Sequence, residues 1–418
     1  MTDQAVTARQ GGERFQTLDA IRGVAVMGIL LLNAFGMAMP DSGYINPRAY
    51  GGGRAIDDAL WAVNFVLFEG KMRGLFSLLF GASMALVVDR ARAKGEGGAS
   101  VHYRRMFWLA LFGLAHHILI WENDILFHYA VIGAVAFLFL DKPPRALKRW
   151  AVGLLIVSCL YHALMAAGMH YVAAQGSAPG ATTEERQAKS GLLDGAAGPG
   201  SPEIAKELTT YRGDYSTIVM SRADPAGLLA FPFLMGFETL GLMLLGVLAL
   251  RNGFLTGGWD GARYRRVARC GYLLGIPPTA ALAGWLWAND FPTLPTFTSF
   301  LAWTEPFRYP VILAHAALAV LALRRLANKA LAARIAAVGR AAFSNYLGTS
   351  LVMTTIFYGY GLDLFGQVRR AEVYLFIFGV WALMLLWSKP WLDRFQYGPL
   401  EWLWRSLARG EAQPMRRA

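Results

Sequence analysis

Charged residues are scarce in this chain: Asp, Glu, Lys and Arg make up 16% of its 418 residues, whereas hydrophobic residues make up 55%. A soluble protein usually carries about 25% charged residues. The apolar residues come in long blocks that are separated by short basic connectors. The sequence therefore predicts an all-α membrane protein that crosses the bilayer many times.

Acidic residues are the scarcer of the two charges, with 28 Asp and Glu against 40 Lys and Arg, which gives a formal net charge of +12. In a soluble domain this excess would suggest nucleic-acid binding. Here the basic residues lie between apolar segments, where the positive-inside rule accounts for them. We therefore expect membrane lipids, and no nucleic acid, as partners.

Cysteine is almost absent, and both cysteines, Cys159 and Cys270, fall within apolar segments. A disulfide framework and a thiolate metal site are therefore not expected. His116 and His117 are adjacent instead of being one helical turn apart, and the sequence contains no HExxH pattern, so no metal site is predicted. The first apolar segment lacks a small-residue cleavage site, so we interpret it as a retained span.

About eleven transmembrane helices are predicted from the apolar segments. These segments are Leu18–Asn33, Ile56–Phe68, Met72–Val88, Phe107–Trp121, Ile125–Leu140, Trp150–Val172, Gly227–Leu250, Val267–Trp287, Phe307–Leu323, Ala341–Tyr360 and Val373–Trp387. Pro277 and Pro278 are expected to kink or break the eighth.

The segments divide the chain into five parts. These are a polar N-terminal tail (1–17), a six-helix membrane bundle (18–172), an extracytoplasmic loop (173–225), a five-helix membrane part (226–388) and a cytoplasmic tail (389–418). Residues 176–200 of the loop are expected to be flexible. The tail is expected to form an amphipathic helix at the membrane interface, because Trp402 and Trp404 lie close to Arg405.

Lys and Arg are concentrated in alternate connectors. A topology with the N-terminus outside and the C-terminus in the cytoplasm places most of the 40 basic residues on the inner side. The first helix then carries Asp19 and Arg22 at its outer end, three residues apart and on one face. Asn33 lies eleven residues beyond Arg22 and returns to that face.

The same topology predicts that many charged residues share the outer side of the membrane. These residues are Asp19, Arg22, Lys71, Arg73, Glu122, Asp124, Glu305 and Arg308. Because unpaired charges at this depth are costly, we expect a polar vestibule that opens outward, with His116 near its floor. Alternatively, the charges form a structural network of ion pairs. Glu238, a lone acid in the seventh span, is expected to pair with Arg22 or Arg73, or to relay protons.

Five motifs, taken in order, resemble the YeiB family of bacterial inner-membrane proteins, which carry a C-terminal DUF418 domain. They are LDAIRGVAVMGILLLN, KMRGLFSLLFGASM, FGLAHHILIWENDILFHYAVIG, VGRAAFSNYLGTSL and RFQYGPLEWLWRSL. The family is similar to a branch of the transmembrane acyltransferases. That group includes the lysosomal enzyme that acetylates heparan glucosamine and bacterial enzymes that modify polysaccharides, and its members open on a similar Leu-Asp-x-x-Arg helix.

The resemblance implies transfer of an acyl group, expected to be acetyl, from a cytoplasmic acyl-coenzyme A to a hydroxyl or amine of an extracytoplasmic glycan or lipid. The bacterial polysaccharide branch has a histidine where this chain has Asn33, so the role of base does not carry over to that position. His116 is the candidate base or acyl carrier, and Asp124 would orient it.

The remaining candidate site residues are assigned to substrate binding: Asp19, Arg22, Asn33, Arg73, Glu122 and Glu238. Arg22 and Arg73 would bind phosphate or an oxyanion, and Asn33 would line an acyl channel. The alternative function is a transporter or exporter of a small solute or lipid, in which no bond is made. A homodimer stays an open alternative.

Overall fold

The computed structural model describes residues 3–196, 198–326 and 329–417. Among these residues every regular element is helical, apart from an isolated β-bridge between Phe395 and Arg416. The α-helices are α1 (Asp3–Ala38), α2 (Asp41–Ile45), α3 (Ala55–Leu67), α4 (Lys71–Ala93), α5 (Gly98–Leu119), α6 (Leu126–Ala136), α7 (Pro144–Gln175), α8 (Thr183–Gly195), α9 (Pro202–Tyr211), α10 (Tyr215–Ser221), α11 (Pro225–Arg251), α12 (Gly261–Ala288), α13 (Thr293–Thr298), α14 (Glu305–Arg325), α15 (Lys329–Arg340), α16 (Ala342–Phe357), α17 (Arg370–Arg394) and α18 (Pro399–Arg409).

The all-helical prediction is confirmed, and each of the eleven apolar segments coincides with a helix. Six helical stretches of the described chain are long and apolar enough to cross a bilayer by themselves. They are Gln16–Ala38, Ala55–Ala93, Pro144–Gln175, Gly227–Arg251, Glu305–Arg325 and Arg370–Arg394. The chain is therefore a membrane protein with several apolar spanning helices.

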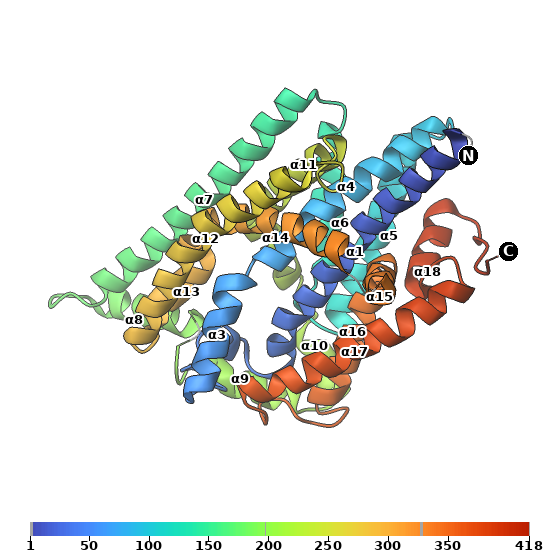
Figure 1. Cartoon of the computed structure of the whole chain (residues 1–418). Helices are drawn as coiled ribbons and strands as arrows, with labels where there is room; N and C mark the ends of the chain where they lie inside the picture. The colour runs from blue at the N-terminus through green and yellow to red at the C-terminus, as the bar shows by residue number, and fades with distance from the viewer. Residues whose placement is uncertain (1–2, 197, 327–328, 418) are drawn as a thin grey trace.

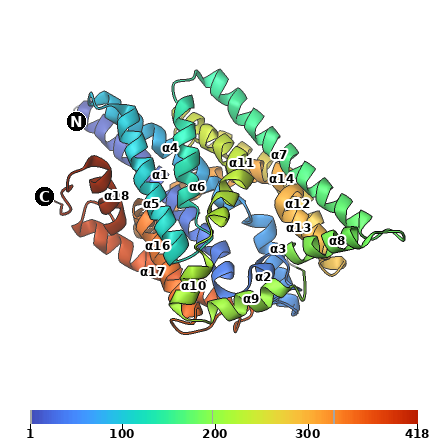
Figure 2. The same ribbon diagram turned by 180° about the vertical axis from the view of Figure 1, so that it is seen from behind.

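Helix α1 runs through the middle of the bundle, where it packs against α4, α15, α16 and α17 (Figures 1 and 2). Most of its apolar side chains are buried, and Ile21 and Phe35 are fully so. Gly23 of α1 lies against the backbone of α15, and Gly339 of α15 lies against the backbone of α1, so that a Cβ at either position would overlap main-chain atoms. Helix α1 is accordingly in contact with protein on several sides.

Helices α3 and α4 follow one another through the bundle without reversing direction. Gly70, which joins them, has a φ of 68°, a left-handed conformation that glycine adopts easily. Helix α4 is antiparallel to α1, because Gly28 packs against Met72 and Arg22 donates to Ser83. The two apolar segments that the sequence suggested as separate spans thus form one interrupted stretch of 39 residues, Ala55–Ala93.

The structure bears on two local expectations. Of the kink or break expected at Pro277 and Pro278, the break is absent, since α12 continues through both prolines. Residues 176–200 were expected to be flexible, yet they contain α8, whose first turn is closed by a capping box between Thr182 and Glu185. In both cases packing outweighs the local tendency of the sequence: α12 packs against α14, and α8 packs against α7.

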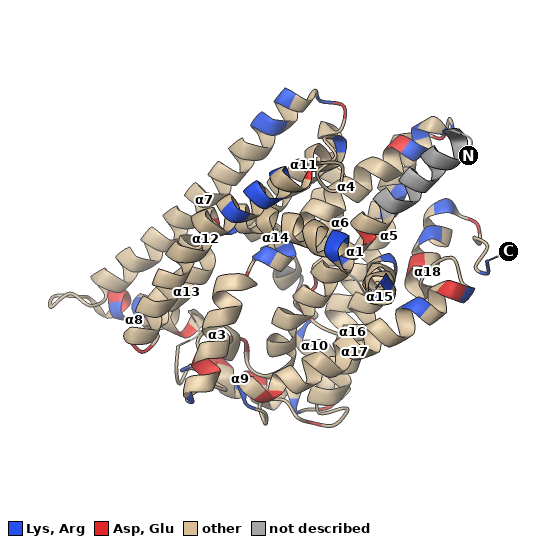
Figure 3. Ribbon diagram, in the orientation of Figure 1, with Lys and Arg blue, Asp and Glu red and all other residues tan. Residues whose placement is uncertain are grey.

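Both ends of the described chain lie at the same end of the bundle (Figure 1). Lys and Arg residues gather at this end, on the first turns of α7 and α12 and on α18, whereas acidic residues on α3, α8 and α9 lie at the opposite end (Figure 3). Helix α18 forms where an amphipathic helix was predicted. It is anchored on the bundle by Glu401, which accepts hydrogen bonds from Phe343 N and from the Ser344 hydroxyl.

Candidate functional site

A histidine and a carboxylate form a buried pair at the turn between α5 and α6. His116 Nδ1 lies 2.8 Å from Asp124 Oδ1, and both side chains are fully buried. Asp124 Oδ2 accepts a second hydrogen bond from Phe127 N, at 2.8 Å, which fixes the carboxylate at the first turn of α6. Because an ionised carboxylate only accepts hydrogen bonds, Nδ1 of His116 donates to Asp124, and in the neutral imidazole Nε2 is left with a lone pair.

Nε2 of His116 has no hydrogen-bond partner among the described residues. A buried polar atom without a partner is unusual, and such atoms are found at functional sites. The same is true of the indole N–H of Trp121, whose ring lies 6.5 Å from the imidazole. His116 Nε2 and the Trp121 N–H are thus two polar groups in the same region that have no partner among the described residues.

Gly113 is what allows α5 and α6 to approach closely enough for this pair. A Cβ at this position would lie 2.7 Å from Asp124 Oδ2 and would overlap the backbone nitrogen of Phe127. Any side chain here would therefore push the turn away from α5. Gly113 and His116 are three residues apart, so they lie on the same face of α5, the face that packs against α6.

Tyr346 of α16 connects the pair to Asn33. Its ring lies 5.3 Å from the imidazole of His116. It also lines a narrow groove, together with Val26, Ile29, Leu30, Asn33, Met37, Thr349 and Ser350. The groove has about 10 Å³ of free space, enough for a single water molecule, so an acyl group does not fit beside Asn33 in this conformation.

The segment formed by residues 173–225 covers the turn between α5 and α6. Tyr215 Oη donates to Leu119 O at 2.9 Å, and Arg222 Nη1 donates to Ile120 O at 2.8 Å. Tyr211 donates to the carboxylate of Glu122. Glu122 therefore serves to hold this segment over the candidate site.

A cluster of carboxylates lies where the loop meets α2. The Glu207 carboxylate accepts a hydrogen bond from Asp41 N at 2.8 Å. Burial raises the pKa of Glu207 to about 7, and the nearby Glu122 carboxylate adds to this shift. Burial, followed by repulsion from Glu207, also raises the pKa of Asp41 well above its ordinary value. Packing of this segment on α2 therefore brings together carboxyl groups whose protonated state is favoured.

Arg73 and Glu238 form a second buried cluster, with Arg308. Glu238 Oε2 lies 2.5 Å from Arg73 Nη2, and Oε1 lies 3.4 Å from Arg308 Nη1. Glu238 therefore pairs with Arg73, one of the two arginines proposed from the sequence, and not with Arg22. Nη1 of Arg73 and Nε of Arg308 have no partner among the described residues. The cluster ties α4, α11 and α14 together.

A second buried histidine–carboxylate pair differs from that of His116, and His116 in turn shares its unpartnered ring nitrogen with His128, whose Nδ1 has no partner among the described residues. His162 Nδ1 lies 2.7 Å from Glu305 Oε2, and its Nε2 lies 2.9 Å from Leu234 O. Both nitrogens of His162 are thus occupied. His162 is a satisfied structural residue, whereas His116 keeps one nitrogen unused.

The structure does not bring Asp19 and Arg22 to the end of the bundle that holds His116. Arg22 Nη1 lies 2.8 Å from Asp19 Oδ1, and its Nη2 donates to Ser83 Oγ at 2.8 Å, in the second half of α4. The single vestibule expected from the sequence therefore divides into two regions. The cause is the interrupted α3–α4 stretch, which runs through the bundle once, whereas the sequence had suggested two crossings.

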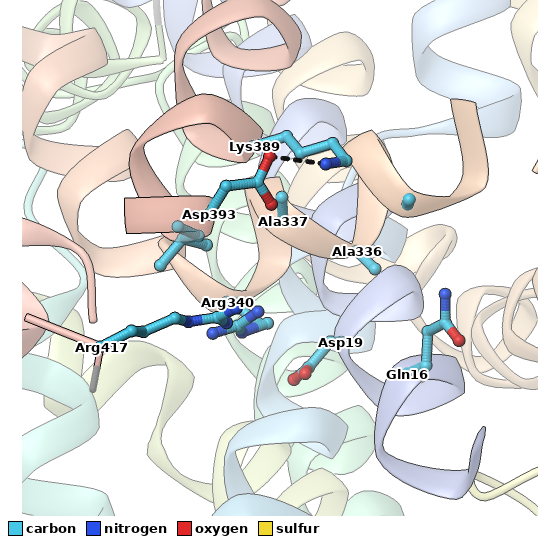
Figure 4. A pocket seen from close by; sticks show the side chains of 10 residues that line it. Gln16, Asp19, Ala336, Ala337, Arg340, Lys389, Asp393 and Arg417 are labelled. Atoms are coloured by element: carbon cyan, nitrogen blue, oxygen red, sulfur yellow. Dashed lines mark hydrogen bonds and ion pairs between the residues drawn. The ribbon is translucent and has the colours of Figure 1, made fainter. Parts of the chain in front are cut away.

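Asp19 instead lines an open pocket of about 400 Å³ at the end where the chain termini lie (Figure 4). Its walls are formed by Gln16, Asp19, Ala333, Ala336, Ala337, Arg340, Lys389, Leu392, Asp393 and Arg417.

Sequence reasoning missed Tyr346 and Trp121. Tyr346, Thr349 and Ser350 are spaced i, i+3 and i+4 on an apolar helix, which places three polar groups on one face. That pattern could have identified the groove. No comparable signal marks Trp121, because an aromatic residue near a helix end is common in membrane proteins. None of the described residues forms a group of three or more metal-binding side chains.

Comparison with known proteins supplies the family. Residues 249–411 match the family described as protein of unknown function DUF418. The chain is 30% identical over 409 residues to the uncharacterized protein YeiB of Escherichia coli, with 96% of this chain and 98% of that protein covered. It is 29% identical over 416 residues to the uncharacterized protein YxaH of Bacillus subtilis, with 96% of each covered.

A third relative, an uncharacterized 39.9 kDa protein of Bacillus acidopullulyticus encoded in the amylase 3′ region, is 23% identical over 406 residues, with 96% of each chain covered. The alignments with all three relatives cover nearly the whole chain. On the strength of the match to the Escherichia coli protein, the chain belongs to the YeiB family, whose C-terminal region is DUF418.

Proposed function

We propose that the protein is a membrane-embedded acyltransferase of the bacterial inner membrane. It transfers an acyl group, most simply acetyl, from a coenzyme A thioester to a hydroxyl or amine of a glycan or lipid. The observation that carries this proposal is the buried pair of His116 and Asp124, in which the carboxylate orients the imidazole and Nε2 is unused. This is the arrangement that general-base catalysis requires.

In the proposed reaction, Nε2 of His116 accepts the proton of the acceptor's hydroxyl or amine as its oxygen or nitrogen attacks the thioester carbonyl carbon. The new ester or amide bond forms and the carbon–sulfur bond breaks. The protonated imidazole then returns the proton to the leaving thiolate, so that neutral His116 is restored. Asp124 stabilises the imidazolium, and Trp121 offers an unpaired N–H in the same region.

The arrangement of the basic residues supports an orientation with both chain ends in the cytoplasm. The end of the bundle that is rich in Lys and Arg faces the cytoplasm under the positive-inside rule (Figure 3). We therefore replace the outside N-terminus by an inside one, and the eleven spans by ten, with α3 and α4 forming a single crossing. Helices α8, α9 and α10 then lie outside.

Purified full-length protein in detergent tests the proposal. Release of free thiol from acetyl-coenzyme A is measured for the unchanged protein, for His116→Ala and for His117→Ala. His117 is the matched control, because it is the neighbouring buried histidine on the same helix. We expect His116→Ala to lose at least about 100-fold in rate and His117→Ala to retain activity. Equal rates in all three folded proteins would refute the proposal.

A transporter is the second candidate, and one observation favours it. The interruption between α3 and α4 meets the start of α14, because a Cβ on Gly70 would lie 2.9 Å from the guanidinium of Arg308. A π-helical turn, Ser299–Trp303, precedes α14. Interrupted helices that meet at a buried charge are a feature of transporter sites. Uptake of solute into proteoliposomes without thioester cleavage would support this candidate.

A further inference from the structure

The pocket beside Asp19 combines a basic rim with an apolar floor. Arg340, at the end of α15, and Arg417, near the C-terminus, lie next to one another at its edge (Figure 4). The floor is made by Ala336, Ala337 and Leu392, which are buried. Partial burial and the neighbouring Arg417 lower the pKa of Arg340. Two arginines held together in this way attract a negatively charged ligand.

The acidic residues of the pocket are already neutralised. Asp19 pairs with Arg22 at 2.8 Å, and Asp393 pairs with Lys389 at 2.6 Å. Among the described residues, Arg340 has one side-chain hydrogen bond, to a backbone carbonyl at 3.3 Å. The pocket therefore keeps a local excess of positive charge that faces the open side.

Arg417 is held in place by the folded C-terminal segment. Gln396 N donates to Met415 O at 2.9 Å, and Trp402 Nε1 donates to Gln413 O at 2.7 Å. Arg417 N donates to Arg394 O at 3.3 Å. The tail thus folds back against the end of α17 and delivers a basic side chain to the pocket.

We propose that this pocket binds a phosphate-bearing organic anion, with its phosphate groups on Arg340 and Arg417 and its organic part on the alanine floor. Arginine pairs recognise phosphate through several charge-assisted hydrogen bonds. The assignment rests on the proposed function for its orientation, in which this end faces the cytoplasm. Both the nucleotide part of coenzyme A and the headgroup of a phosphatidic acid present this chemistry.

The position of the pocket suits the donor of the proposed reaction. Asp19 and Asn33 are fourteen residues apart on α1, a separation of about 21 Å along the helix. A thioester on a long flexible arm is long enough to span this distance, but the groove beside Asn33 would have to widen before the arm could reach the region of His116. A short phosphate ligand would stay at the cytoplasmic end.

Equilibrium binding to the full-length protein in detergent tests the assignment, with coenzyme A, with pyrophosphate and with nanodiscs that contain phosphatidic acid. The variants are Arg340→Gln and Arg417→Gln, with Arg266→Gln as control. Arg266 is an exposed arginine of α12 outside the pocket. We expect each pocket variant to weaken binding about tenfold and the control to leave it unchanged.

A variant that is expected to bind more tightly separates a local effect on binding from a loss of folding. Asp393→Asn removes a carboxylate from the pocket and frees Lys389, so we expect binding to tighten about two- to fivefold. Arginine-dependent binding of coenzyme A identifies a nucleotide site, and arginine-dependent binding of phosphatidic acid alone identifies a lipid site. Either outcome supports the assignment.

The assignment is overturned if none of the three probes binds in a manner that depends on Arg340 or Arg417. Its failure is distinct from failure of the proposed function. His116→Ala is expected to bind coenzyme A with unchanged affinity while losing thioester cleavage. If the protein binds coenzyme A through the two arginines but never cleaves the thioester, the assignment of the pocket is supported and the proposed acyltransferase activity is refuted.

Discussion

The ring of Tyr346 lies 5.3 Å from the imidazole of His116, centroid to centroid, and forms one wall between that imidazole and Asn33. The hydroxyl of Tyr346 accepts only a long hydrogen bond, from Ile125 N at 3.4 Å, so Tyr346→Phe should cost no more than about 1 kcal/mol in the free energy of unfolding and keep the rate within about threefold. Tyr346→Ala should leave a cavity, cost about 3–5 kcal/mol in the free energy of unfolding and lower the rate further. Thermal unfolding and thiol release measure both effects. An equal loss in Tyr346→Phe would show that the hydroxyl takes part directly.

Gly113→Ala should separate α5 from α6. Its Cβ would overlap the backbone of Phe127 and crowd the Asp124 carboxylate. We expect a loss of about 1–3 kcal/mol in the free energy of unfolding and a larger proportional loss in rate. Gly153→Ala is the control, since a Cβ at that position of α7 meets no atom within 4 Å. Unchanged activity in Gly113→Ala would contradict the requirement for close approach.

Closure of the loop over the site should depend on pH. Burial raises the pKa of Glu207 to about 7, above the value near 4.5 that it has when exposed. The closed state therefore binds a proton that the open state releases, and closure weakens as the pH rises from about 4.5 to 7. Hydrogen exchange of α9 and α10 is measured from pH 5 to 8.5, and each rate is divided by the intrinsic exchange rate at that pH; the resulting protection should fall up to about pH 7 and then level off. In Glu207→Gln this fall in protection should disappear; its persistence would assign the effect to another group.

The proposed orientation can be tested by labelling single cysteines in intact cells. Cys159 and Cys270 are first replaced, and a cysteine is then placed at Lys189, in α8, or at Arg409, in α18. A membrane-impermeant maleimide should label the first in cells whose outer envelope is opened and the second only after the inner membrane is disrupted. The reverse pattern would place both chain ends outside.

Much of the helical framework could be predicted from the sequence, because each apolar segment is bounded by polar connectors. The path of the chain could not. A hinge such as that around Gly70 fits either a reversal or a bend, and only the packing of Met72 against Gly28 decides between them. The error in this one hinge placed Asp19 and Arg22 on the wrong side of the predicted vestibule.

The pairing of His116 with Asp124 is the part of the candidate site that sequence reasoning could reach, because the two residues lie eight apart around a tight turn. The groove beside Asn33 could not be predicted from the sequence, since it depends on how α16 packs against α1. Long-range contacts of this kind leave only a weak trace in a single sequence, here the spacing of Tyr346, Thr349 and Ser350.

The central claim is that His116 and Asp124 act as one catalytic unit. The most direct measurement is the rate of thioester cleavage by the unchanged protein, His116→Ala, Asp124→Asn and the double variant. Asparagine keeps an oxygen that can accept from Phe127 N. We expect both single variants to lose at least about 100-fold and the double variant to lose no more than His116→Ala, because residues that act together are not additive. Losses that multiply in the double variant, or full activity in either single variant, would contradict the account.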